Sequence, residues 1–565
     1  MPRRRIAPRP GLLVGLAYLV LVLGFTWPLP LHLADRVILA RGNDVWQHLW
    51  NFSWVRTALL AAPHSPYFTH GIFYPDGVPL VYHALNLFSA VLSLPLQLLW
   101  GLVPAFNLLM IGNLLAAALA ANWLARVLGL DRGPSFLAGL LFGFSSPLAV
   151  ALTEGQGELV SVFWMPLYIG LLLRGAGWRA VGLPPAGYAY LVGAGLALAG
   201  SLLAVPYWFV SLLVWTGVYA LTELWAVRQG GRAGAGPVLG RLALTAAVTV
   251  VVLGPLLLLM VRDQARSDTG PGITQSATTE AVTFNGSQDP VAWLRPLPGR
   301  GDPGELGNNG HKLGLGWLMP GLALLALLGS RGVRRRALGL WAGAAATLAV
   351  LTLGPSLVFN GQDTGIPLPY ALILRLPGAA AMRLPLRFNT LLMLCLAVLA
   401  AYGLALLSRP TGAAWRRSVV AVVAVALVVG ELFGAPRPLV SAAVPVFFQQ
   451  LAAQPSPCLT ELQRPLSGCD ALLELPQDPW GPLGMYHAAV SRHPMVGGYT
   501  SRHYPYSFAG DAPGVAQLVA PTAADLGPDI YTPSLRDLAL RTMDYYGLRY
   551  VVVHPLDEYR AADAL

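Results

Sequence analysis

Long uncharged apolar windows recur along the whole chain, and they constrain its fold more than any other feature. A helix needs about 20 mostly apolar residues to cross the ~30 Å hydrocarbon core of a membrane. Windows of this kind cover residues 10–34, 84–125, 133–153, 159–173, 180–222, 242–261, 313–330, 337–362, 388–408 and 418–430. Two of them, 84–125 and 180–222, are long enough for two helices each, with Pro206 marking the expected turn in the second. The sequence therefore predicts about twelve hydrophobic helices.

Composition agrees with a chain that spends most of its length in lipid. Of the 565 residues, 55% are hydrophobic and only 11% are charged, whereas soluble domains carry roughly 25% charged residues. The net charge of +10 does not indicate nucleic-acid binding in such a chain, because the basic residues report orientation in the membrane. We predict an all-α polytopic protein of the cell (plasma) membrane with membrane lipids, and no nucleic acid, among its partners.

Basic residues predict the orientation of the helices. They cluster at the N-terminus and between windows, at Arg126/Arg132, Arg174/Arg179, Arg228/Arg232/Arg241, Arg331/Arg334/Arg335/Arg336 and Arg409/Arg416/Arg417. If all are cytoplasmic, the N-terminus lies inside and everything after residue 431 outside. The first apolar run is too long for a cleavable signal core. The interval before Arg126 holds an odd number of helices, so either 84–102, weakened by Pro95 and Pro104, is a surface or re-entrant helix, or Arg126 and Arg132 lie outside. We expect the first. Eleven crossings remain.

This topology divides the chain into two parts. Residues 1–435 form the membrane core, with outer loops at 35–83, 263–312 and 363–387, and residues 436–565 form a small extracytoplasmic cap. In the cap, 471–475 (ALLEL) and 550–554 (YVVVH) are strand-like, and 535–545 has the spacing of a short helix. These patterns predict an α/β cap. Cys458 and Cys469 could form a disulfide if the cap is exported, whereas Cys395 sits in an apolar run as a packing residue.

The first polar island after the first span is the segment 41–50 (RGNDVWQHLW). It places the carboxylate of Asp44, the imidazole of His48 and the indoles of Trp46 and Trp50 just beyond a membrane boundary. An acid beside aromatic rings at a membrane surface suits chemistry on a lipid-linked polar substrate. The same residues also fit an amphipathic helix that lies in the membrane interface.

Further acidic candidates lie in the segment 154–158 (EGQGE), between two predicted helices. Glu154 and Glu158 would sit at helix ends on the outer face, where they could hold a divalent cation or orient an acceptor. Oxygen ligands of this type suit Mg²⁺ or Mn²⁺. A solvated turn between two spans is the alternative.

Basic candidates on the same outer face are Arg383 and Arg387, in the segment 382–388 (MRLPLRF). The planar guanidinium group binds phosphate oxygens bidentately, so the two residues are suited to a lipid phosphate or diphosphate. Snorkelling toward lipid headgroups is the alternative. No phosphate-cradling glycine loop, His-Glu-x-x-His helix or Gly-x-Ser-x-Gly elbow occurs, and the cytoplasmic loops are too short for a nucleotide-binding domain.

The order and spacing of several short motifs resemble the GT-C superfamily of polytopic glycosyltransferases, especially the bacterial YfhO-like group, across nearly the whole chain. The motifs are Gly42-Asn43-Asp44, Ile72-Phe73-Tyr74-Pro75-Asp76-Gly77, Phe144-Ser145-Ser146-Pro147, Trp164-Met165-Pro166-Leu167, Arg383 to Phe388, Leu473-Glu474-Leu475-Pro476, Gly498-Tyr499-Thr500-Ser501-Arg502 and Gly547 to Val553. The resemblance implies that Asp44 is the catalytic or metal-adjacent carboxylate. Relatives often have a histidine in a Gly-His-like turn where this chain has Gly155-Gln156-Gly157-Glu158, so this turn departs from the family pattern.

The resemblance implies transfer of a sugar from a polyprenyl-phosphate donor to a glycan, lipid or protein acceptor on the outer face. Nucleotide sugars stay in the cytoplasm, so a donor used outside must be lipid-linked. Asp44 would be the general base or hold a cation, and Arg383 and Arg387 would neutralise the lipid phosphate. Trp46, His48 and Trp50 would contact the substrate. A lipid flippase or transporter, or a non-catalytic envelope assembly factor, is the alternative; a transporter predicts charges at mid-membrane, whereas these gather at the outer boundary.

Overall fold

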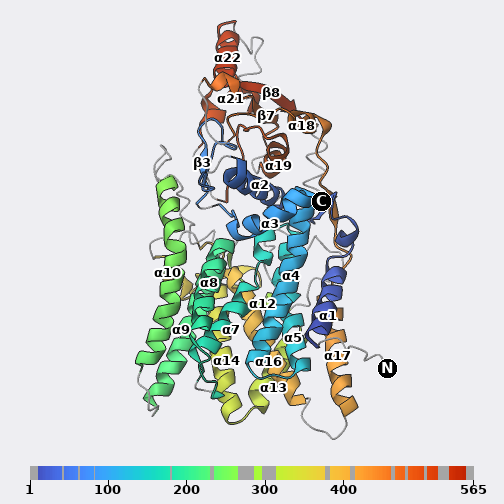
Figure 1. The fold of residues 1–565 in the computed structure, drawn as a ribbon, viewed down its shortest axis with the longest axis vertical. Helices are drawn as coiled ribbons and strands as arrows, with labels where there is room; N and C mark the ends of the chain where they lie inside the picture. Colours follow the sequence, from blue (N-terminus) through green and yellow to red (C-terminus); the bar gives the residue numbers. More distant parts are fainter. Residues whose placement is uncertain are drawn as a thin grey trace, which may run out of the picture.

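The structure is a computed structural model that describes residues 10–40, 44–61, 64–81, 83–178, 181–229, 235–264, 286–294, 314–375, 382–407, 414–459, 465–477, 481–501, 506–519 and 533–554. A long bundle of helices makes up most of it, and a smaller mixed domain stands on one end of the bundle (Figure 1). The predicted fold class, a helical polytopic core with a small α/β C-terminal part, is confirmed.

Within the described residues, six helical stretches are long and apolar enough to cross a membrane. They are α4 (Leu102–Val127), α5 with α6 (Arg132–Gly143 and Ser146–Thr153), η3 with α7 (Gly157–Val160 and Trp164–Ala176), α9 (Pro206–Arg228), α10 (Gly236–Gln264) and η6 with α16 (Pro385–Phe388 and Asn389–Leu407). In six further helices the apolar stretch is shorter. They are α1 (Pro10–Phe25), α3 (Leu87–Trp100), α8 (Tyr188–Ala204), α13 (Leu318–Gly329), α14 (Val333–Thr352, apolar from residue 337) and α17 (Ala414–Leu432, apolar from residue 422). The predicted set of about twelve hydrophobic helices is confirmed, and α9 begins at Pro206 as expected.

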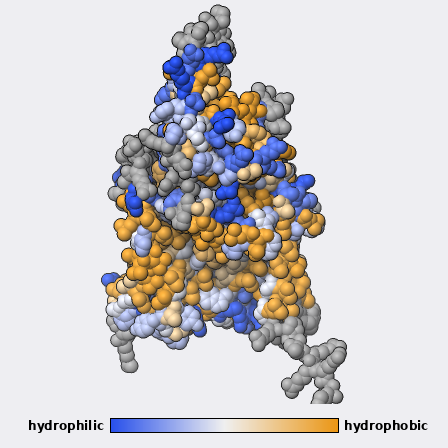
Figure 2. Space-filling model, turned by 45° about the horizontal axis from the view of Figure 1, so that its top comes forward, coloured by the Kyte–Doolittle hydropathy of each residue, from blue (hydrophilic) through white to orange (hydrophobic). Residues whose placement is uncertain are grey.

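The bundle exposes apolar side chains on its outside, as a lipid-facing surface requires. On α10, Val251 and Leu258 are 74% and 73% exposed. Hydrophobic residues cover the sides of the bundle, and hydrophilic residues gather toward its ends and over the cap (Figure 2). Because exposing this much leucine and valine to water is unfavourable, the bundle is built to lie in a bilayer.

Helix α3 is one of the shorter apolar helices, and it lies at the outer end of the bundle. Its 14 residues span about 21 Å as a helix, which is less than the ~30 Å of a hydrocarbon core. It lies beside α2 (Asp44–Arg56) near the cap (Figure 1). Its last residues, Leu98 to Trp100, are more than half exposed. This arrangement agrees with the predicted surface helix, whereas the count of eleven crossings stays a prediction.

Two predicted windows are divided in the structure. The window 133–153 is broken after Gly143, and α6 restarts at Ser146 with Pro147 in its first turn, because proline fits the first turn of a helix but not its interior. The window 337–362 was predicted as helix throughout, but α14 ends at Thr352 and the hairpin of β4 (Ser356–Phe359) and β5 (Gln362–Pro367) follows. Gly354 permits this change of direction because its φ is +82°.

The cap is built around two parallel strands, as the sequence predicted. Strand β7 (Ala471–Leu475) pairs with β8 (Leu548–Val553). The remaining elements of the cap are β6 (Leu439–Ser441), α18 (Val446–Leu451), η7 (Leu466–Gly468), α19 (Pro482–Ser491), α20 (Phe508–Asp511), α21 (Val515–Val519) and α22 (Pro533–Tyr545). The predicted disulfide between Cys458 and Cys469 is present, with a Cα–Cα distance of 5.1 Å.

The segment after the first helix is part of the same packed unit as the cap. Strand β1 (Arg36–Ile38) pairs antiparallel with β6, and β2 (Phe68–Thr69) pairs with β3 (Val78–Pro79). The hydroxyl of Tyr74 donates to the carbonyl of Tyr546 at 2.7 Å, and the amide of Phe73 donates to the carbonyl of Gly497 at 2.7 Å. The cap is thereby joined to the outer end of the bundle, although the boundary at residue 435 itself stays a prediction.

Candidate active site

Helix α2, which begins at Asp44, lies between the bundle and the cap (Figure 1). Every residue from Val45 to Val55 is buried, because the helix is covered by α3 and the bundle on one side and by α19 on the other. An amphipathic helix lying in the membrane interface needs one exposed polar face, so that alternative is wrong. Asp44 is half-buried at the first turn of this enclosed helix, where a carboxylate also interacts favourably with the helix dipole.

The turn that follows α6 brings a second carboxylate against α2. Gly155 has a φ of +71°, and a Cβ there would lie only 2.9 Å from the backbone nitrogen of Val45. Gly157 is equally confined, because a Cβ there would lie 2.9 Å from the ring of Phe106. Glycine is therefore required at both positions for close approach. The result is that Glu158 enters the buried interior instead of sitting in a solvated turn.

Glu158 forms a buried ion pair with α2. Its carboxylate lies 2.5 Å from Nε2 of His48, and both side chains are less than a tenth exposed. Burial alone would lower the pKa of His48, but the carboxylates of Glu158 and Asp44 outweigh burial and raise it. His48 is thus held as an imidazolium ion, which compensates the charge of Glu158 in a site with little water.

Asp44 faces the same buried charges. Burial raises the pKa of Asp44, and Glu158 raises it further, against the opposing effects of His48 and Arg387. The amide of Gln47 donates to the Asp44 carboxylate at 2.7 Å. Asp44 is therefore a carboxylate with increased affinity for a proton, held in one orientation by its own helix.

The two predicted arginines reach this site from the segment that precedes α16. Arg387 is an electrostatic neighbour of Asp44, His48 and Glu158, and its guanidinium lies 4.9 Å from the centroid of the Tyr207 ring. Arg383 donates to the carbonyl of Ser501 in the cap at 2.8 Å. Both guanidinium groups thus lie where bundle, α2 and cap meet.

The site also contains two residues that the sequence analysis did not single out. Burial raises the pKa of Tyr499 in the cap to about 12, and this side chain interacts electrostatically with Asp44, Glu158 and both arginines. His83 donates a hydrogen bond from Nε2 to Oδ1 of Asn51, at 2.8 Å. Its Nδ1 accepts a hydrogen bond from the backbone N–H of Ser501, at 3.4 Å. Tyr499 lies in one of the motifs that resemble the GT-C superfamily, so the sequence offered a signal for it. Nothing in the sequence pointed to His83.

Other predicted substrate contacts are packed against protein. Trp46 stacks on Tyr486 of α19, with ring centroids 5.3 Å apart, and Trp50 stacks on Trp54 at 5.9 Å. Both indoles are buried. Their role toward a sugar or isoprenoid therefore stays a prediction, and their observed contribution is to fix α2 between bundle and cap.

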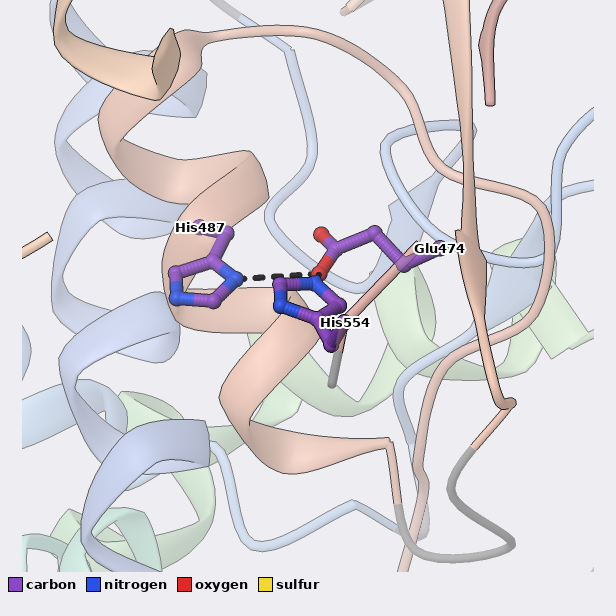
Figure 3. Close-up of side chains that lie close together, drawn as sticks. All are labelled: Glu474, His487 and His554. Carbon is purple, nitrogen blue, oxygen red and sulfur yellow. Dashed lines mark hydrogen bonds and ion pairs between the residues drawn. The ribbon is translucent and has the colours of Figure 1, made fainter. Parts of the chain in front are cut away.

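The predicted cation ligands Glu154 and Glu158 do not stand together in a three-ligand group. Among the described residues, the three His, Cys, Asp or Glu side chains whose ligand atoms lie within 4.8 Å of one another are Glu474, His487 and His554 of the cap (Figure 3). At the candidate active site, Glu158 is paired with His48 instead. Binding of Mg²⁺ or Mn²⁺ at this turn stays a prediction.

Taken together, the site combines a basic carboxylate with two guanidinium groups at the outer end of a membrane bundle. A carboxylate of this kind can accept a proton from a hydroxyl group. Guanidinium groups can hold phosphate oxygens and stabilise negative charge that develops on them. The arrangement therefore suits transfer of a phosphate-linked group to a hydroxyl acceptor.

Comparison with solved structures supports the fold of a helical membrane bundle with an outer mixed domain. No family model matches the chain, and no curated protein matches its sequence. The archaeal oligosaccharyltransferase AglB from Archaeoglobus fulgidus, in complex with an inhibitory peptide and a dolichol-phosphate, is similar with a TM-score of 0.51 and 14% identity. The match covers 96% of this chain and 69% of AglB.

A second similar structure is the arabinofuranosyltransferase AftD from Mycobacteria, with a TM-score of 0.51 and 16% identity. It is matched over 91% of this chain, which spans 33% of the AftD chain. At such identities the likeness establishes the fold alone. The chain has the GT-C fold, and its place in the YfhO-like group stays a prediction.

Proposed function

We propose that the protein transfers a sugar from a polyprenyl-phosphate-linked donor to a glycan, lipid or protein acceptor on the outer face of the plasma membrane. The observation that carries this proposal is the meeting of Asp44 and Arg387 where bundle and cap join. The similar structures support it, since AglB is an oligosaccharyltransferase solved with a dolichol-phosphate and AftD is an arabinofuranosyltransferase.

In this mechanism Asp44 acts as the general base. The acceptor oxygen attacks the anomeric carbon, its proton passes to the Asp44 carboxylate, and the bond between that carbon and the phosphate oxygen breaks. General-base catalysis typically contributes about 10²–10⁴-fold to the rate. Burial and Glu158 favour this role because they raise the pKa of Asp44, and Gln47 holds the carboxylate in place.

Arg387 and Arg383 stabilise the leaving lipid phosphate. The bond that breaks leaves its electron pair on the phosphate, and a fixed guanidinium stabilises that charge without reorganising. Tyr207 supports Arg387 from below through its ring, and the carbonyl of Ser501 anchors Arg383 to the cap. The Glu158–His48 pair would position α2, and with it Asp44, without touching the substrate.

The proposal also places the cap and the candidate site outside the cytoplasm. The disulfide between Cys458 and Cys469 supports an extracytoplasmic cap, because disulfides persist in oxidising compartments. With the N-terminus in the cytoplasm and the cap outside, the candidate site faces the compartment that holds lipid-linked donors.

The test is sugar transfer by the purified full-length protein in nanodiscs, from a panel of radiolabelled polyprenyl-phosphate sugars. Wild-type protein should turn over at least one donor, and Asp44→Asn should lower the rate by about 10²-fold or more, as expected for loss of a general base. Asp35→Asn is the matched control, because Asp35 lies on the same outer segment with its side chain 63% exposed.

The controls separate the alternatives. Equal rates for wild type and Asp44→Asn would remove Asp44 from the mechanism. If wild-type protein with an intact thermal melt transferred no sugar from any donor, the proposal would fail in favour of a flippase or an envelope assembly factor. Movement of the labelled lipid between the two leaflets of liposomes that contain the same protein would then identify the flippase.

A further inference from the structure

A second cluster of ionisable side chains lies in the cap (Figure 3). Glu474 comes from β7, His487 from α19, and His554 directly follows β8. One carboxylate oxygen of Glu474 lies 2.9 Å from Nδ1 of His487 and 2.8 Å from Nε2 of His554. All three ligand atoms lie within 4.8 Å of one another.

The cluster is buried, and one of its hydrogen-bond acceptors has no partner among the described residues. Glu474 and His487 are each 4% exposed, and the side chain of His554 is 11% exposed. Phe448 of α18 stacks on the His487 ring with centroids 4.4 Å apart. The second carboxylate oxygen of Glu474 is buried with no hydrogen-bond partner among the described residues, and leaving a buried carboxylate oxygen unpartnered is costly.

We propose that Glu474, His487 and His554 bind one divalent transition-metal ion of the zinc class. Two imidazole nitrogens and one carboxylate are a common ligand set for Zn²⁺, with a fourth position left for water. Imidazole ligands favour zinc and its neighbours in the first transition series, whereas Mg²⁺ and Ca²⁺ prefer a shell of oxygens. The site is distinct from the acidic site at Asp44.

The geometry of the three side chains suits a metal ligand set. Both imidazole rings direct one nitrogen at the same carboxylate oxygen of Glu474, at 2.9 and 2.8 Å, so a metal ion placed between them would meet three ligand atoms. Metal–nitrogen bonds of about 2.0–2.1 Å then need only small outward movements of the three side chains.

The position of the cluster indicates a structural role. The ion would tie β7, α19 and the end of β8 together, and these ligands are up to 80 residues apart in the chain. His487 adjoins Tyr486, whose ring stacks on Trp46 of α2. Metal binding would therefore fix α19 against the helix that carries Asp44.

The test uses the full-length protein in detergent, freed of its affinity tag and stripped with a chelator. After incubation with Zn²⁺ and gel filtration, wild-type protein should retain one more zinc per chain than Glu474→Gln, His487→Gln or His554→Gln, with a higher melting temperature. Loss of a ligand should weaken binding by more than the roughly 10–100-fold that loss of an outer-shell partner costs. His493→Gln is the matched control, because His493 is a buried histidine of the same domain outside the cluster.

Equal zinc retention by wild type and the ligand variants would overturn the proposal, as would retention of none by wild type. A second measurement needs no variant and covers the case in which a variant does not fold. Co²⁺ added to metal-free wild-type protein should produce the visible absorption of a tetrahedral site, and Zn²⁺ should abolish it. Absence of that absorption would equally contradict the site.

Discussion

Replacing Gly155 by alanine tests how the second carboxylate is delivered to the candidate active site. The φ of Gly155 is +71°, and an added Cβ would lie 2.8 Å from Cβ and 2.9 Å from the backbone nitrogen of Val45. An L-residue in the left-handed region costs about 1–2 kcal/mol, and overpacking a filled interior costs about 1–3 kcal/mol. The free energy of unfolding should therefore fall by roughly 2–5 kcal/mol.

Gly129→Ala is the matched control for this prediction. Gly129 has a φ of +81° but no atom within 4 Å of the position of its Cβ, so only the backbone cost of about 1–2 kcal/mol applies. Both variants would be compared with wild type by chemical unfolding in detergent and by sugar transfer in nanodiscs. We expect Gly155→Ala to be the less stable variant and to lose transfer activity, since the turn sets the position of Glu158 against His48. Equal destabilisation of the two variants would refute the close approach of Gly155 to α2.

Three further predictions concern the arginine pair, the cap and a buried histidine. Arg387→Gln should lower the transfer rate by about 10²–10³-fold, the usual effect of removing one group that stabilises transition-state charge. The control Arg375→Gln, at an exposed position, should leave the rate unchanged. An unchanged rate in Arg387→Gln would exclude the proposed phosphate contact. The disulfide between Cys458 and Cys469 closes a loop with a sequence separation of 11, so replacing both cysteines by alanine should lower the stability of the cap by roughly 3 kcal/mol. Chemical unfolding would measure this loss, with Cys395→Ala as the control for loss of a thiol. No loss would show that the loop is already ordered without the disulfide. Burial lowers the pKa of His83 to about 3, so below pH 6.5 the unfolded chain binds a proton that the folded chain does not. As the pH falls from about 6.5 to about 5, this residue should remove stability at a rate that approaches about 1.4 kcal/mol per pH unit. His83→Asn should show a shallower loss over this interval in parallel melts, and identical slopes would contradict a neutral, buried His83.

The helices of the core were predictable because lipid leaves few alternatives. Each long apolar window must satisfy its backbone hydrogen bonds internally, so residues 102–127 and 206–228 could be assigned to helices from hydropathy alone. Local breaks were predictable only where proline marked them, as at Pro206. The end of α14 at Thr352 was missed, because residues 353–362, which lead into the hairpin, carry no charge.

The candidate site was predictable only in part, because its members come from distant segments. Asp44 and Arg387 stood out as charges beside membrane spans, and the structure brings them together. The pairing of β1 with β6, which ties residue 36 to residue 441, has no local signature. Tyr499 lies in the cap and His83 in the segment before α3, so only the packed structure brings them to the site. Trp46 and Trp50 are buried against protein, and their contact with a substrate stays a prediction.

The central claim is that Asp44 drives transfer of a sugar away from a polyprenyl phosphate. Its most direct test follows both products by mass spectrometry in a single-turnover reaction of nanodisc-embedded protein. Wild-type protein should release polyprenyl phosphate in equal amount to the glycosylated acceptor, and Asp44→Asn should release neither above background over the same time. Release of polyprenyl phosphate without a glycosylated acceptor, or equal product from Asp44→Asn, would contradict the account.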